Sequence, residues 1–105
     1  MSKYKVYLSP VAELKLSLLH KDIGDSWGAH TKDNFLNTFT RKINLIAEYP
    51  KACPFNADFG GIYKCVVSKQ TSFFYRIVIN EIEVLTITDN RQNPEQIKKE
   101  LKKLS

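Results

Sequence analysis

The sequence predicts an α+β domain in which a hairpin of two helices packs on a small antiparallel sheet. The stretch Ser72–Pro94 holds two runs of alternating residues with a short break between them, the pattern of an antiparallel strand pair. Two consecutive segments with helical spacing of apolar residues precede this pair, and a third follows it. The predicted order of elements is therefore β-α-α-β-β-β-α.

The bulk properties fit a single domain that spans residues 1–105. At this length roughly two thirds of the unfolded surface can be buried, enough for a core without metal or disulfide support. The hydrophobic share is 43%, and no apolar run approaches the ~20 residues that span a bilayer. The start of the chain also lacks the apolar core of a signal peptide. We therefore expect a cytoplasmic protein that does not enter a membrane.

The first strand and the first helix are expected on either side of Ser9. Tyr4–Leu8 alternates as a half-buried strand does. Ser9 and Pro10 then have the pattern of an N-cap followed by proline at the first helical position. Apolar residues after Pro10 form two neighbouring stripes, and Gly24 is a natural stop for this helix.

The second helix is expected to run from a cap at Thr31 to about Tyr49, just before Pro50. Its apolar residues recur at intervals of four, four and three: Phe35, Phe39, Ile43 and Ile46. The segment Lys51–Gly61 contains proline and glycine and has no clean periodicity, so we expect a loop there.

Three strands should follow this loop. Ile62–Lys69 alternates, and in Phe73–Ile79 the odd-numbered side chains share one face while Arg76 interrupts the apolar pattern of the other. Ile82–Asp89 repeats the alternation. Asn80–Glu81 is short enough to be the two-residue turn of a hairpin, since asparagine tolerates positive φ.

The chain becomes polar after the last strand and then predicts a third helix. Asn93, Pro94 and Gln96 have the pattern of an N-cap, a first-turn proline and a capping box. Three apolar residues form a stripe too narrow to be stable alone: Ile97, Leu101 and Leu104. We expect this stripe to dock on the body or to bind a partner.

No self-contained catalytic centre or cofactor site is recognisable in the sequence. It has no Gly-rich phosphate loop, nucleophile elbow or metal-ligand spacing, and both histidines, His20 and His30, lie on or beside the helices. Cys53 and Cys65 lie twelve positions apart without zinc-type spacing, and a reducing compartment disfavours a disulfide. We expect free thiols, no metal and no cofactor.

The net charge of +5 comes almost wholly from lysine, with 13 Lys and 3 Arg, and it favours an acidic or polyanionic partner. Lys64, Arg76 and Arg91 could together form a basic surface for phosphates. Arg76 is the strongest of these candidates, because an arginine inside an apolar strand must find a carboxylate, a phosphate or the sheet edge. The nearest carboxylates are either general bases or ion-pair partners of these arginines: Asp58, Glu83 and Asp89.

Five short motifs follow one another along the chain: Leu8-Ser9-Pro10, Glu48-Tyr49-Pro50, Gly61-Ile62-Tyr63-Lys64, Phe74-Tyr75-Arg76-Ile77-Val78 and Ile87-Thr88-Asp89-Asn90-Arg91-Gln92-Asn93-Pro94. In this order they resemble the RelE/ParE superfamily, the toxins of bacterial type II toxin–antitoxin pairs, often described as plasmid stabilisation proteins. The resemblance implies a helical hairpin against a small curved antiparallel sheet. It also implies a growth-inhibiting toxin that an acidic antitoxin neutralises by wrapping the sheet and helices.

The resemblance leaves the target open between DNA gyrase and the ribosome with its mRNA. In the nuclease branch, Lys64 and Arg76 match positions that hold mRNA phosphate, and Arg91 matches a basic group after the last strand. Nuclease members usually also have a His or Tyr there, and this chain has neither, so Asp58 would have to replace it. We therefore favour inhibition by binding to gyrase or another nucleic-acid machine. The alternatives are a ribosome-dependent mRNA endonuclease and a non-toxic binding module of the same fold.

Overall fold

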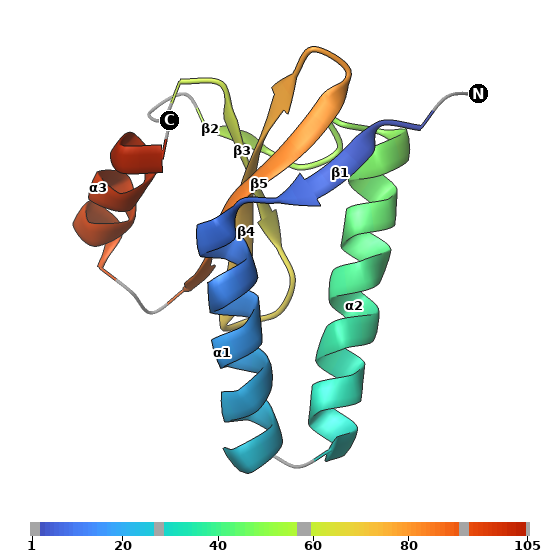
Figure 1. Cartoon of the computed structure of the whole chain (residues 1–105), viewed down its shortest axis with the longest axis vertical. Helices are drawn as coiled ribbons and strands as arrows, with labels where there is room; N and C mark the ends of the chain where they lie inside the picture. The colour runs from blue at the N-terminus through green and yellow to red at the C-terminus, as the bar shows by residue number, and fades with distance from the viewer. Residues whose placement is uncertain (1–2, 27–28, 57–59, 91–92, 105) are drawn as a thin grey trace.

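The computed structural model describes residues 3–26, 29–56, 60–90 and 93–104, without the side chains of residues 19–33, 56 and 104, and shows an α+β fold (Figure 1). Its elements are β1 (Lys5–Leu8), α1 (Pro10–Ser26), α2 (Ala29–Glu48), β2 (Phe55–Asn56), β3 (Ile62–Val66), β4 (Thr71–Val78), β5 (Glu81–Asp89) and α3 (Pro94–Leu104). The predicted fold class and order of elements are confirmed, and the short β2 is added inside the expected loop. Within the described ranges, no helix combines the length and the apolar character needed to cross a membrane.

The sheet has the strand order β1-β5-β4-β3-β2 and is mixed. The four strands from β2 to β5 pair antiparallel, but β1 runs parallel to β5, so the expectation of a wholly antiparallel sheet is corrected at this edge. Alternation alone does not specify strand direction. The direction is held by Ser9, whose N–H donates to the Val84 carbonyl at 2.9 Å and whose hydroxyl donates to the Leu85 carbonyl at 2.7 Å.

The same serine caps α1, as predicted, because its Oγ accepts a hydrogen bond from the Ala12 N–H at 3.1 Å. Two other helix boundaries differ from the prediction. α1 continues past Gly24 to Ser26, since one glycine costs a helix only about 1 kcal/mol, and α2 begins at Ala29 rather than after a cap at Thr31.

The turn of the β4–β5 hairpin also differs by one residue from the prediction. Val78 pairs with Glu81, so the turn consists of Ile79 and Asn80 instead of Asn80–Glu81. Ile79 has a φ of 58° and is 92% exposed, so it is not the buried end of the apolar strand face that the alternation predicts.

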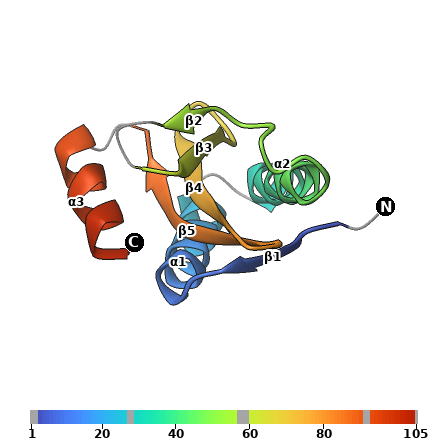
Figure 2. The ribbon, with the colours of Figure 1, turned by 90° about the horizontal axis from the view of Figure 1, so that it is seen from above.

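The helical hairpin covers one face of the sheet and forms the main core with it (Figure 2). Aromatic rings form one continuous chain from this core to the exposed Phe55. Neighbouring ring centroids are 5.2–6.2 Å apart, in the order Phe35, Phe39, Phe73, Tyr75, Tyr63 and Phe55. The odd-numbered residues of β4 belong to this face, as their alternation predicts. The hydroxyl of Tyr75 donates to the Pro50 carbonyl at 2.7 Å and ties the sheet to the chain just after α2.

The third helix lies on the opposite side of the sheet from α2 (Figure 2). Its Asn93 cap is confirmed, since the Asn93 Oδ1 accepts from the Glu95 N–H at 2.9 Å. Ile97 and Leu101 are buried in a second cluster with three sheet residues, Ile62, Phe74 and Leu85. Leu85 is the extra residue of a β-bulge, because Tyr75 pairs with Val84 while Phe74 pairs with Thr86. The bulge allows both Leu85 and Thr86 to contact this helix.

Candidate functional site

Arg76 forms an ion pair with Glu83 on the sheet face that also carries α3. The two residues lie directly opposite each other on β4 and β5, and the Arg76 Nε donates to the Glu83 Oε1 at 2.8 Å. Their side chains are 36% and 18% exposed. The arginine has therefore found a carboxylate, one of the alternatives expected for it, and its charge is balanced inside the sheet face.

Lys64 lies on the same face as Arg76. On β3 it pairs with Phe74, and its Nζ is 6.0 Å from the centre of the Phe74 ring, a cation–π distance. Since Ile62 pairs with Arg76, Lys64 occupies the diagonal position, roughly 7–8 Å away between backbones. The structure therefore brings these two predicted cations together.

Two other residues predicted for this site fall on undescribed stretches of the chain, after β5 and between β2 and β3. Arg91 and the candidate base Asp58 lie outside the described residues. Asn90, in the predicted polar exit, has a structural role. It accepts from the Ser72 hydroxyl at 2.6 Å and donates to the carbonyls of Ser68 and Lys69, which secures the turn between β3 and β4.

A partly buried carboxylate that the sequence analysis missed fixes the third helix. Glu100 accepts a hydrogen bond from the Thr86 hydroxyl at 2.7 Å and forms an ion pair with Lys15 of α1. Glu100 follows two lysines on an otherwise basic helix and precedes the buried Leu101, which is the signal that could have identified it. Ile97 and Leu101 of the predicted partner-binding stripe thus pack on the body, and the side chain of Leu104 is outside the description.

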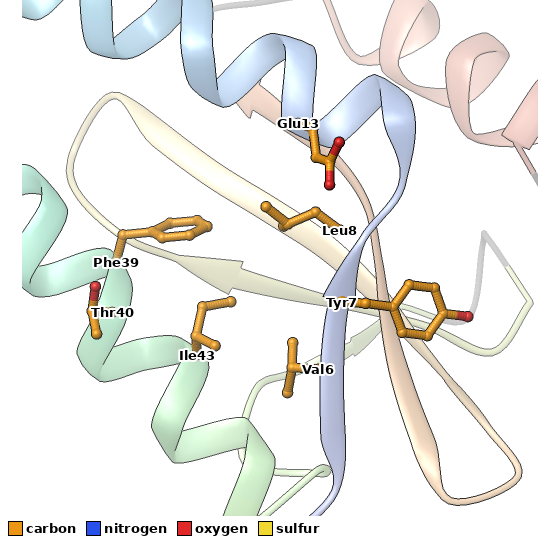
Figure 3. Close-up of a pocket in the computed structure, with 7 residues that line it drawn as sticks. All are labelled: Val6, Tyr7, Leu8, Glu13, Phe39, Thr40 and Ile43. Atoms are coloured by element: carbon orange, nitrogen blue, oxygen red, sulfur yellow. The ribbon is translucent and has the colours of Figure 1, made fainter.

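An apolar surface remains open on the side of α1. Leu14 and Leu18, one helical turn apart, are 61% and 54% exposed. A groove of about 390 Å³ lies between β1, α1 and α2, lined mostly by apolar side chains and also by Glu13 and Thr40. Figure 3 shows the apolar side chains of Val6, Leu8, Phe39 and Ile43 pointing toward one another, while Tyr7 points away.

The helical hairpin packed on a small sheet is the arrangement expected from the resemblance to the RelE/ParE superfamily. A chain from the structure of the chromosomal ParDE toxin–antitoxin system from P. aeruginosa has this fold, with a TM-score of 0.70. The match covers 83% of this chain and 96% of that chain at 11% sequence identity. No protein-family model and no curated protein sequence matches. The predicted resemblance is therefore confirmed at the level of the fold.

Proposed function

We propose that this protein is the toxin of a type II toxin–antitoxin pair and that it inhibits growth by binding gyrase or another nucleic-acid machine in the cytoplasm. The observation that carries the proposal is the fold shared with a chain of the ParDE system along 96% of that chain. The motifs that resemble the RelE/ParE superfamily support it independently, because they occur in the expected order.

Binding is favoured over RNA cleavage by the state of the two cations on the sheet face. A nuclease of this kind would use Arg76 to stabilise charge on a reacting phosphate. Here the Arg76 guanidinium is already paired with Glu83 at 2.8 Å, and Lys64 lies over the Phe74 ring. A phosphate bound to the other N–H groups of this guanidinium would be repelled by the nearby Glu83 carboxylate, whereas a protein partner can use the intact charge pair as a polar contact.

The expected antitoxin should bind the open apolar surface of α1 and the adjacent groove. A partner could bury the exposed side chains of Leu14 and Leu18 and the apolar walls of the groove. The net charge of +5 also attracts an acidic chain. The predicted stripe of α3 is a less suitable surface, since Ile97 and Leu101 are buried in the isolated chain. An antitoxin would have to displace α3 to use it.

Pulse labelling after induced expression tests the target. We expect DNA synthesis to fall before protein synthesis, as gyrase poisoning requires. Early loss of protein synthesis, with messages cut at the ribosomal A site in a translation reaction, would contradict the proposal and establish the endonuclease alternative. No growth defect from soluble protein would instead indicate a non-toxic binding module.

The variants Lys64→Ala, Arg76→Ala and Arg91→Ala extend this test to the basic surface. Lys102→Ala is a matched control, because Lys102 is an exposed cation on α3. We expect the first three to weaken growth inhibition and the control to retain it, with soluble protein levels compared in every culture.

A further inference from the structure

The two free cysteines lie opposite each other across the β2–β3 pair. Phe55 pairs with Tyr63 and Asn56 with Ile62, so the same register continued two residues back places Cys53 opposite Cys65. The pairing does extend this far, because the Lys64 N–H donates to the Pro54 carbonyl at 3.0 Å. The cysteines are therefore cross-strand neighbours even though twelve positions separate them.

Their type of pairing matches the geometry of a disulfide. The hydrogen bond from Lys64 to Pro54 makes these two residues a hydrogen-bonded pair. Because hydrogen-bonded and non-hydrogen-bonded pairs alternate along antiparallel strands, the adjacent cysteines form a non-hydrogen-bonded pair. Non-hydrogen-bonded antiparallel pairs have Cα atoms about 4.5 Å apart, inside the range of about 4.4–6.8 Å that disulfides span. Both side chains also belong to the same core cluster, so they point to the same face.

The surroundings of the pair favour one reactive thiol. Cys53 is 8% exposed, against 1% for Cys65, so it is the cysteine that is nearer the surface. A hydrogen bond from Cys65, with help from Tyr75 and the positive charge of Lys42, lowers the pKa of Cys53 to about 7. The same hydrogen bond and burial raise the pKa of Cys65. Cys53 is thus the attacking thiolate and Cys65 the resolving thiol.

We propose that Cys53 and Cys65 form a redox-sensitive modification site that closes into a cross-strand disulfide when a low-molecular-weight disulfide such as oxidised glutathione is the oxidant. This inference does not depend on the proposed toxin function, since it concerns thiol chemistry in the folded chain. The expectation of free thiols holds for the reduced protein, in which both cysteines are free and buried.

The reaction proceeds in two exchange steps. The Cys53 thiolate attacks one sulfur of glutathione disulfide, the S–S bond of glutathione breaks, and one glutathione thiolate leaves. Cys65 then loses its proton and attacks the Cys53 sulfur, which breaks the mixed disulfide and releases the second glutathione. The two cysteines lose two electrons and two protons in total, and the two glutathione thiols that form take up both.

The experiment uses the full-length chain in glutathione buffers of increasing oxidised fraction, followed by trypsin digestion without reductant. Trypsin cuts after Lys51, Lys64 and Lys69, so peptides 52–64 and 65–69 carry one cysteine each. We expect these peptides to be joined and the intact mass to fall by two hydrogens. The melting temperature should rise by about 5–15 °C, because the bond closes a short loop of the unfolded chain.

Single variants test the assigned order of attack. Cys65→Ser should accumulate a glutathione adduct on Cys53, whereas Cys53→Ser should remain unmodified under the same conditions. Separate adducts on both cysteines of the wild type, a dimer linked between chains, or no reaction would each overturn the proposal. A cross-link that lowers the melting temperature would overturn it as well. If a variant fails to fold, the joined peptides, the intact mass and the melting temperature of the wild type still test the proposal.

Discussion

Ile79 occupies the first position of the β4–β5 turn in a backbone conformation that suits glycine. Its φ is 58°, and no positive φ is found at Asn80, so the turn has the positive-φ pattern of type II′, which favours glycine at its first position. A β-branched side chain is strained there and contributes nothing to the core, since Ile79 is 92% exposed.

Ile79→Gly should therefore stabilise the protein. Removing the Cβ relieves about 1–2 kcal/mol of left-handed strain, and the added freedom of the unfolded chain cancels about 0.5–1 kcal/mol of that gain. We expect a net gain of about 0.5–1 kcal/mol, measured by urea unfolding. Ile79→Ala is the control and should change stability little, since alanine keeps the Cβ. A loss of stability in Ile79→Gly would show that the isoleucine side chain itself stabilises the turn.

The thiol pair predicts a specific pH dependence under reducing conditions. Cys53 has a folded pKa of about 7, below its ordinary 9.0, so between these values the unfolded state binds more protons. Its contribution to the free energy of unfolding therefore increases from pH 7 to 9 and is lost as pH falls through 7. The pKa values of Cys65 and Tyr75 are raised, so their contributions are lost as pH rises above 9.0 and 10.0.

We expect the free energy of unfolding to rise from about pH 6 to about pH 9 and to fall above it, measured by urea unfolding with reductant present. In Cys53→Ala the rise should disappear, because the group whose pKa is lowered to about 7 is gone. An unchanged slope in the variant would assign the pH dependence to other groups.

Among the elements, the β4–β5 hairpin shows how much depends on one residue of register. The sequence predicted both strands, the shared face of Phe73, Tyr75 and Ile77, and a carboxylate partner as one option for Arg76. A turn at Asn80–Glu81 would have placed Arg76 opposite Leu85. The observed turn places it opposite Glu83 instead, which creates the ion pair of the candidate site. Alternation could not predict this partner, because it does not determine where the turn lies.

The third helix is held by one apolar cluster and one carboxylate. Leu101 is 1% exposed against Ile62, Phe74 and Leu85, and we expect Leu101→Ala to destabilise the protein by about 2–4 kcal/mol. Thermal unfolding measures the change, and Lys102→Ala on the exposed side of the same helix is the matched control. If Leu101→Ala left the melting temperature unchanged, α3 would not be docked in solution as the structure has it.

At the scale of the whole molecule, the periodicity of the sequence was sufficient to predict the helices and strands but not the contacts that join them. Amphipathic stripes predicted the helical hairpin, and caps at Ser9 and Asn93 predicted two helix starts. Three features depend on contacts that are not local in the sequence. The parallel pairing of β1 with β5 joins residues more than 75 positions apart. The bulge at Leu85 and the role of Glu100 depend on contacts with a neighbouring strand or helix. Local patterns contain no information on such contacts.

The arrangement of the whole molecule decides where a partner can bind, because the helical hairpin packs on one face of the sheet and α3 packs on part of the other (Figure 2). Exposed apolar area remains on α1, where Leu14 and Leu18 are 61% and 54% exposed, and a groove with apolar walls lies between β1, α1 and α2. The double change Leu14→Ser and Leu18→Ser should weaken binding of the cognate antitoxin at least ~10-fold, since each leucine loses about 1.5–3 kcal/mol of burial.

Isothermal titration calorimetry measures this affinity, and thermal unfolding confirms that the double variant folds, as expected for two exposed positions. Tyr49→Ser is the matched control, because Tyr49 is also 61% exposed but follows the end of α2. Binding should also weaken as salt is added, because a chain of net charge +5 attracts an acidic partner through screened charges. If the Tyr49 variant lost affinity and the double variant kept it, the antitoxin would bind at the end of α2, and the open surface of α1 would need another explanation.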